Sequence, residues 1–166
     1  MLRLLRSTKP YLHFPNFGMK FFVREAAAED AGDITGLSNQ LGYSLSADDT
    51  LQNLKTIREN KNEIVLVATH EEKIVGWIHA FLATRVESGS FCEISGLVTD
   101  VQHRRMGVGK LLIDNIISWC STKGFPVVRV RCNIKRTEAH DFYSKLGFRE
   151  NKQQKIFEIV LRAGHS

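Results

Sequence analysis

Long apolar runs are missing from this sequence of 166 residues. Hydrophobic stretches such as residues 64–68 are far shorter than the roughly 18 apolar residues that a membrane-spanning helix needs. The first 18 residues also lack the apolar core of a secretory signal and the serine-rich composition of an organelle transit peptide. We therefore expect a cytoplasmic protein with no membrane partner.

Cysteine is also scarce. The three cysteines, Cys92, Cys120 and Cys132, form no C-x-x-C pair and no spacing with histidine that is typical of metal ligands. We therefore expect reduced, structural thiols and no metal. The composition, with 43% hydrophobic and 25% charged residues, excludes disordered, collagen-like and coiled-coil chains.

The net charge of +5 is unevenly distributed along the chain. Residues 1–24 carry five basic and no acidic side chains, residues 25–103 carry 5 basic and 13 acidic, and residues 104–166 carry 13 basic and 5 acidic. This asymmetry suits a protein that holds an anionic ligand on one side and a cationic one on the other, or a surface on which the charges mix in space. No motif for reading DNA or RNA occurs, so we expect no nucleic-acid partner.

The N-terminal residues are distinct from the rest of the chain. Met19 stands directly before a strand-like segment, whereas residues 1–18 are basic and contain Pro10 and Pro15. We expect an N-terminal extension over residues 1–18, upstream of an ancestral start, and a single domain over residues 19–166.

Hydrophobic periodicity predicts a mixture of strands and helices. Strands are expected at residues 21–25, 63–70, 73–84, 91–99, 127–133 and 155–161. Helices are expected at residues 28–41, from a capping box at residues 46–49 to about residue 60, and at residues 107–123 and 137–146. This order predicts a mixed α/β layer arrangement with an antiparallel first half and one strand–helix–strand crossover.

A basic, glycine-containing loop joins the strand at 91–99 to the next helix. Such a junction offers free backbone N–H groups and the positive end of a helix dipole, which together bind phosphate. A Walker A motif is excluded because Arg104 and Leu111 stand where it needs Gly and Ser or Thr. A dinucleotide fingerprint is excluded because Leu112 stands where its third Gly belongs.

Two motifs together resemble the GNAT superfamily of acyl-CoA-dependent N-acetyltransferases. The R-x-x-G-x-G pattern at residues 104–109 resembles the family's pyrophosphate-binding loop, and residues 139–148 resemble its A-x-x-F-Y-x-x-x-G-F segment. Residues 23–26 and 74–77 resemble its first strand and its V-G-x strand. The resemblance covers roughly residues 20–160.

The resemblance implies an α/β fold with a mixed, mostly antiparallel sheet of six to seven strands, about four flanking helices and a splay between strands 4 and 5. It implies an enzyme that moves an acetyl group from acetyl-CoA to a primary amine by direct attack on the thioester. A homodimer is compatible with it. The alternative is a catalytically silent acyl-CoA-binding sensor.

The acceptor is a small molecule or peptide amine that the sequence does not identify. Acidic side chains in the first half of the chain favour a cationic small molecule, a lysine side chain or an N-terminal amine. These acids are Asp30, Asp33, Asp48, Asp49 and Glu87.

The resemblance also implies which residues bind acetyl-CoA. Backbone N–H groups of the loop would hold the pyrophosphate, and Gly96 would form a bulge beside donors that stabilise the oxyanion. The expected set is Leu97, Val98, Thr99, Arg104, Arg105, Met106, Gly107, Val108, Gly109, Lys110, Asn133 and Tyr143.

Catalysis requires a proton donor for the thiolate and an acceptor for the amine proton. Tyr143 matches the family tyrosine that acts as general acid, and packing beside Phe142 is its structural alternative. Glu93 is the first candidate base and His79 the second, because histidine suits proton transfer at neutral pH. The alternatives are that His79 has only a structural role in its strand, or that a water relay takes the place of a base.

Overall fold

The computed structural model describes residues 20–161, and the expected extension over residues 1–18 lies outside the described residues. The chain forms two compact units, residues 1–131 and 132–166, which are considered separately below. No helix among residues 20–161 has the length and apolar character required to span a membrane.

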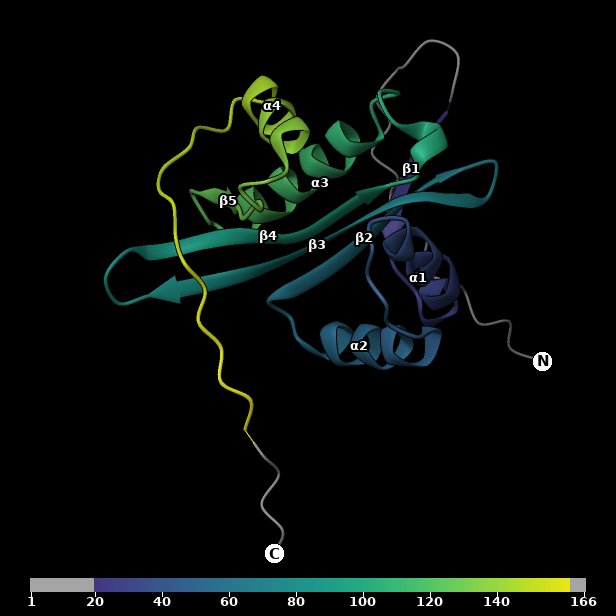
Figure 1. The fold of residues 1–166 in the computed structure, drawn as a ribbon, viewed down its shortest axis with the longest axis horizontal. Helices are drawn as coiled ribbons and strands as arrows, with labels where there is room; N and C mark the ends of the chain where they lie inside the picture. The colour runs from purple at the N-terminus through teal and green to yellow at the C-terminus, as the bar shows by residue number, and fades with distance from the viewer. Residues whose placement is uncertain (1–19, 162–166) are drawn as a thin grey trace, which may run out of the picture. The chain divides into compact units, whose positions relative to one another are not determined.

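The first unit is built on one five-stranded sheet in the order β1-β2-β3-β4-β5 (Figure 1). Its strands are β1 (Phe22–Glu25), β2 (Glu63–His70), β3 (Lys73–Arg85), β4 (Gly89–Thr99) and β5 (Val128–Val130). The pairs from β1 to β4 are antiparallel, whereas β4 and β5 are parallel. The change of direction at β5 follows from the helical crossover that separates it from β4.

Helices cover both faces of this sheet (Figure 1). The first unit contains η1 (Ala28–Asp30), α1 (Ala31–Asn39), α2 (Ala47–Glu59), η2 (Val101–His103) and α3 (Val108–Thr122), and the second unit contains α4 (Thr137–Lys145). The expected capping box begins α2, because the Ser46 hydroxyl accepts from Asp49 N at 3.1 Å while the Asp49 carboxylate accepts from Ser46 N at 3.3 Å.

One core layer lies between the sheet and helices α1 and α2. Buried side chains of α1, α2 and β2 form it, and Trp77 of β3 packs against them. Its fully or nearly buried members are Ala26, Ala31, Ile34, Leu54, Val65 and Val67.

The other core layer lies between the sheet and α3. Leu112, Ile116 and Cys120 of α3 are completely buried. Gly76 of β3 permits this close packing, because a Cβ there would stand only 3.0 Å from Val108 Cγ1 and 3.3 Å from Leu112 Cδ1. The loop that precedes α3 is therefore anchored to the sheet by the first turns of a buried helix.

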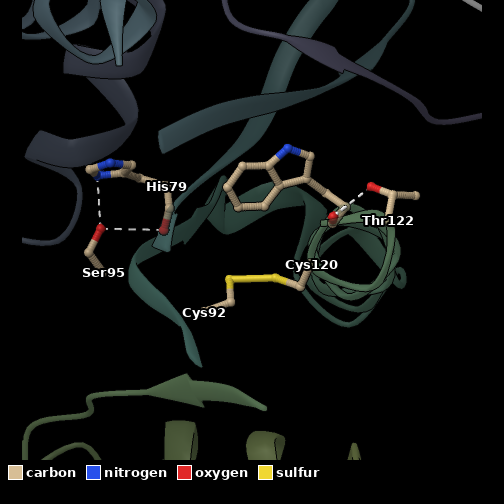
Figure 2. The surroundings of a disulfide bond; sticks show 6 residues. His79, Cys92, Ser95, Cys120 and Thr122 are labelled. Carbon is tan, nitrogen blue, oxygen red and sulfur yellow. Dashed lines mark hydrogen bonds between the residues drawn. A yellow bond between two sulfur atoms is a disulfide. The ribbon is translucent and has the colours of Figure 1, made fainter. Parts of the chain in front are cut away.

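A disulfide crosses this second layer. It joins Cys92 of β4 to Cys120 of α3, with the two Cα atoms 6.2 Å apart (Figure 2). The expectation of reduced thiols is therefore wrong for this pair. The sequence did not indicate the pairing because 28 positions separate the cysteines, and only the packing of α3 on β4 brings them together.

The five strands are fewer than the six to seven expected. Residues 155–161 form no strand, and their side chains Ile156, Phe157 and Val160 are each at least 78% exposed. An extended segment becomes a strand only when a neighbour completes its hydrogen bonds, and no pairing to this segment occurs within residues 20–161. The strand expected at 127–133 is also shorter, covering Val128–Val130.

Candidate active site

A β-bulge interrupts the pairing of β3 and β4. His79 pairs with Gly96 and Ala80 pairs with Ile94, so Ser95 is an extra residue on β4. The bulge therefore lies at the position expected from Gly96. A Cβ at Gly96 would stand 2.8 Å from two ring carbons of Trp77, so only glycine fits beneath this indole.

Beyond the bulge, β4 separates from β5. The parallel pairing ends with Ile94 and Val130, whereas β4 continues to Thr99. Residues 95–99, which include Leu97 and Val98, thus have no strand partner on the β5 side within the part of the chain that the structure describes. This is the splay expected between strands 4 and 5, and it leaves backbone groups open to pair with an extended ligand.

The loop after β4 ends in an uncapped helix N-terminus. Gly107 is the N-cap of α3, with a φ of 88°, and no side chain among the described residues caps the first turn. Arg105 also has a left-handed φ, of 63°. Arg104, Arg105 and Met106 are exposed, so the first N–H groups of α3 face a basic, accessible loop that suits an anion.

The remaining loop residues have different surroundings. The side chain of Val108, the first residue of α3, is buried against Gly76 and is part of the core. Lys110 extends along the helix surface and forms an ion pair of 2.6 Å with Asp114. An anion at this site would therefore contact mainly the backbone of Val108, Gly109 and Lys110.

Hydrogen bonds from α1 hold the start of the loop. Gln40 Nε2 donates to Asp100 at 3.1 Å, Val101 N donates to Gln40 Oε1 at 3.1 Å, and His103 Nδ1 lies 2.6 Å from Asp100. Burial acts to raise the pKa of Asp100, but the hydrogen bonds from His103 and Gln40 outweigh it and hold the pKa below its ordinary value. Gln40 was not recognised in the sequence because its contact depends on how α1 packs.

His79 has a polar partner at each ring nitrogen. Its Nε2 lies 3.1 Å from Glu63 Oε2 of β2, and its Nδ1 lies 2.8 Å from Ser95 Oγ of β4, as Figure 2 shows for Ser95. Asn60 Nδ2 donates to the other Glu63 oxygen at 2.7 Å. Sequence reasoning identified His79 but missed Glu63 and Ser95. The pairing of β2 with β3 places Val65 opposite His79. Glu63 lies two residues before Val65, on the same face of the sheet, and this spacing could have indicated it.

Glu93 lies in a different environment. It is 6% exposed, and its Oε1 is 2.6 Å from Arg131 Nε. A buried carboxylate whose lone pairs face a guanidinium has little access to a proton from an incoming amine. Of the two candidate bases, His79 is the one with a ring nitrogen that faces an exposed hydroxyl, that of Ser95.

Tyr143 lies in the second unit, on α4. Its ring makes edge contacts with Phe142 and Phe148, with centroids 5.2 and 5.6 Å away. Burial raises the pKa of Tyr143 to about 12. The Cys132 thiolate adds to this increase, and the positive charge of Arg136 opposes it. The phenol is therefore a hydrogen-bond donor throughout the physiological pH range.

Asn133 begins the turn that leads into α4. Its Oδ1 accepts from Lys135 N at 2.9 Å, and its carbonyl accepts from Arg136 N at 2.9 Å. His140 Nε2 lies 3.0 Å from the same carbonyl. This arrangement agrees with a turn residue and leaves the amide nitrogen of Asn133 outside these bonds.

The acidic side chains expected to attract a cation divide into two groups. Asp30 is buried and forms a two-pronged ion pair with Arg24, at 2.6 and 2.8 Å. Asp33, Asp48, Asp49 and Glu87 are exposed, although Asp49 also takes part in the capping box of α2. Only the exposed acids are accessible to a cationic molecule. Within residues 20–161, no group of three or more His, Cys, Asp or Glu side chains is arranged to hold a metal ion.

Comparisons with known proteins agree with this geometry. The model of the acetyltransferase (GNAT) family matches residues 24–148. The uncharacterized N-acetyltransferase YhdJ of Bacillus subtilis is 26% identical over 68% of this chain and 80% of its own length. Among solved structures, a transcriptional regulator from Bacillus halodurans has a TM-score of 0.77 at 21% identity, covering 84% of this chain and all of its own. The aminoglycoside N-acetyltransferase AAC(6')-Iy, solved with CoA, has a TM-score of 0.78 at 19% identity, covering 88% of this chain and 99% of its own.

Proposed function

Because this chain belongs to the acetyltransferase (GNAT) family, we propose that it transfers an acetyl group from acetyl-CoA to the primary amine of a small cationic molecule. It is an acetyl-CoA-dependent acyltransferase. The observation that carries the proposal is the succession of three features along one segment of chain: the bulge at Ser95, the unpaired edge of β4, and the uncapped N-terminus of α3.

These features suit the parts of acetyl-CoA in order. The pyrophosphate binds the N–H groups of the first turn of α3, and Arg104 adds positive charge. The pantetheine arm lies along residues 97–99 and pairs with their backbone as an added strand would. The acetyl carbonyl then reaches the bulge, where backbone N–H groups of Leu97 and Val98 stabilise the developing oxyanion. Asn133 is a further residue that the family resemblance assigns to acetyl-CoA binding.

Proton transfer completes the reaction. The amine arrives as an ammonium ion, and His79 accepts its proton while the Glu63 carboxylate stabilises the resulting imidazolium. Glu93 is the second candidate because it is paired with Arg131. Tyr143 acts as the acid at the departing sulfur. Because a thiolate is a weaker base than a phenolate whose pKa is about 12, Tyr143 acts mainly through a hydrogen bond to the thiolate.

A small cationic amine is the acceptor that the observations favour. Several structures of similar fold are aminoglycoside acetyltransferases, including one solved with a bisubstrate analogue. Asp33 and Asp48 of α1 and α2 are exposed on the helices that cover the His79 face of the sheet. Their negative charge attracts polyamines and aminoglycosides more strongly than neutral amines.

The test is CoA release, followed with a thiol reagent, from acetyl-CoA and a panel of polyamines, aminoglycosides, amino acids and lysine peptides. Calorimetric titration with acetyl-CoA accompanies it. We expect binding and turnover with at least one polycationic small molecule. Binding without turnover on any amine would support the acyl-CoA sensor instead, and failure to bind acetyl-CoA would refute the proposal.

A further inference from the structure

Three side chains from adjacent strands form a chain of hydrogen bonds in the first unit. Glu63 of β2, His79 of β3 and Ser95 of β4 are joined by distances of 3.1 and 2.8 Å. Asn60, the C-cap of α2, holds the outer carboxylate oxygen of Glu63 at 2.7 Å. The order is an orienting acid, an imidazole and a hydroxyl.

The proton positions follow from this order. The Glu63 carboxylate only accepts, so it places the imidazole proton on Nε2 and leaves a lone pair on Nδ1. Ser95 Oγ–H then donates to Nδ1 (Figure 2), and Oγ also lies 3.3 Å from the His79 carbonyl, a longer and weaker contact. A hydroxyl that donates to an imidazole oriented by a carboxylate has the arrangement of an activated nucleophile.

Accessibility distinguishes these residues from a buried polar cluster. Ser95 is exposed, and the side chains of His79 and Glu63 are 23% and 27% exposed. Ser95 is also the extra residue of the bulge, immediately beyond the last pair of β4 with β5. Under the function proposed above, this is where the acetyl thioester lies. The position proposed for the thioester therefore brings its carbonyl carbon next to the Ser95 hydroxyl.

We propose that Ser95 is itself an acetyl acceptor, and that the protein has an amine-independent acetyl-CoA thioesterase activity that proceeds through O-acetyl-Ser95. The proposal rests on acetyl-CoA binding as described under the proposed function. A bound amine attacks the thioester directly, whereas in its absence the Ser95 hydroxyl takes the place of the nucleophile.

The reaction balances with acetyl-CoA and water alone. Ser95 Oγ bonds to the carbonyl carbon while its proton passes to His79 Nδ1, and Glu63 stabilises the imidazolium. The carbon–sulfur bond breaks, and the CoA thiolate takes the proton from His79. Water then attacks the serine ester with His79 as base, releasing acetate, and the proton returns to Ser95 Oγ.

The test uses the full chain without any amine. Labelled CoA is mixed with unlabelled acetyl-CoA, and the appearance of label in acetyl-CoA is measured together with CoA release. Label exchange faster than the spontaneous thiol–thioester exchange of a control without protein indicates a covalent acetyl-enzyme, because direct hydrolysis is not reversed. Acid-quenched samples are digested, and the peptide that contains Ser95 is examined for one added acetyl group by mass spectrometry.

Four variants make the test specific. Ser95→Ala and His79→Gln remove the nucleophile and the base. Glu63→Gln keeps the shape of the positioning residue but removes its charge. Ser90→Ala is the matched control, because Ser90 is another exposed serine of β4 whose Oγ bonds to Thr84 at 2.9 Å, away from the bulge.

We expect wild type and Ser90→Ala to exchange label and to carry acetyl on Ser95. Ser95→Ala should lose exchange by at least about a thousandfold, and His79→Gln by about a hundredfold or more, while both still bind acetyl-CoA. Glu63→Gln should lower kcat for CoA release by more than about tenfold with acetyl-CoA affinity unchanged, which a merely structural role would not produce.

Three results would overturn the inference. They are the absence of label exchange in wild type, acetylation at a residue other than Ser95, and full exchange by Ser95→Ala. If wild type transfers acetyl to an amine yet shows no exchange, this inference fails and the proposed function stands. If wild type does not bind acetyl-CoA, both fail.

Discussion

The indole of Trp77 lies directly over Gly96. A Cβ at position 96 would stand 2.8 Å from the Cζ3 and Cη2 atoms of the ring, closer than any carbon contact can be. Trp77 in turn packs against the core beneath α1 and α2. The bulge that exposes Ser95 is therefore fixed by a bulky side chain on the neighbouring strand, which cannot move without disturbing that core.

Replacing Gly96 by alanine tests this relationship. We expect Gly96→Ala to lower the free energy of unfolding by about 1–3 kcal/mol, because either Trp77 or β4 must shift. Urea denaturation measures the change. Gly36→Ala is the control, since nothing lies within 4 Å of a Cβ there and alanine in helix α1 should stabilise by up to about 1 kcal/mol. Equal stability of Gly96→Ala and wild type would contradict the packing.

Gly107 tests the anion site at α3. Gly107→Ala and Gly89→Ala both place alanine at a positive φ, of 88° and 71°, and each should destabilise the protein by about 1 kcal/mol. Only Gly107→Ala adds a methyl group beside the N–H groups of α3, so only it should weaken acetyl-CoA binding, by about tenfold or more. Calorimetry compares the two. A comparable loss of affinity in both variants would mean that backbone strain alone is responsible.

Tyr143 should affect the rate rather than binding. We expect Tyr143→Phe to lower kcat by about a hundredfold or more while acetyl-CoA affinity is retained. Tyr43→Phe, at an exposed tyrosine of the first unit, is the control. Because the pKa of Tyr143 is raised to about 12, the phenol stays protonated, and kcat should not fall around pH 10, where an ordinary tyrosine ionises. A decline near pH 10 that Tyr143→Phe abolishes would contradict the raised pKa.

Asp30 gives the protein a defined sensitivity to acid. Although burial opposes it, the hydrogen bonds from Arg24 and Ala27 lower the pKa of Asp30 in the folded state. The unfolded chain therefore binds the proton more readily, and stability should decrease as the pH falls below about 4 toward the lower native pKa.

Asp30→Asn removes this linkage. It should cost about 1–3 kcal/mol at pH 7, with the difference from wild type shrinking as the pH falls below about 4. Urea denaturation at several pH values measures it. Asp33→Asn, at an exposed acid of α1, should show neither effect. A difference in unfolding free energy between Asp30→Asn and wild type that stays constant across the pH range would show that the ion pair does not account for the lost stability.

The features that the sequence predicted correctly are local ones. The Ser46 and Asp49 capping box lies within a single turn, and the loop around Gly107 lies at one strand–helix junction. In both cases, residues three to six positions apart determine the conformation, so the pattern contains the information. The strand expected at 155–161 is the counterexample. Its pattern was strand-like, but a strand also needs a partner that the pattern does not provide.

The sequence by itself therefore determined the family, the glycine-containing loop before α3 and most helices and strands, because these depend on short-range spacing. Only the tertiary structure showed how the surroundings of the two candidate bases differ. The sequence ranked Glu93 before His79 as candidate base, but packing buries Glu93 against Arg131 and places His79 between Glu63 and Ser95. The physical reason is register. One extra residue in β4 turns Ser95 toward His79, and strand pairing across three strands cannot be read from any one of them.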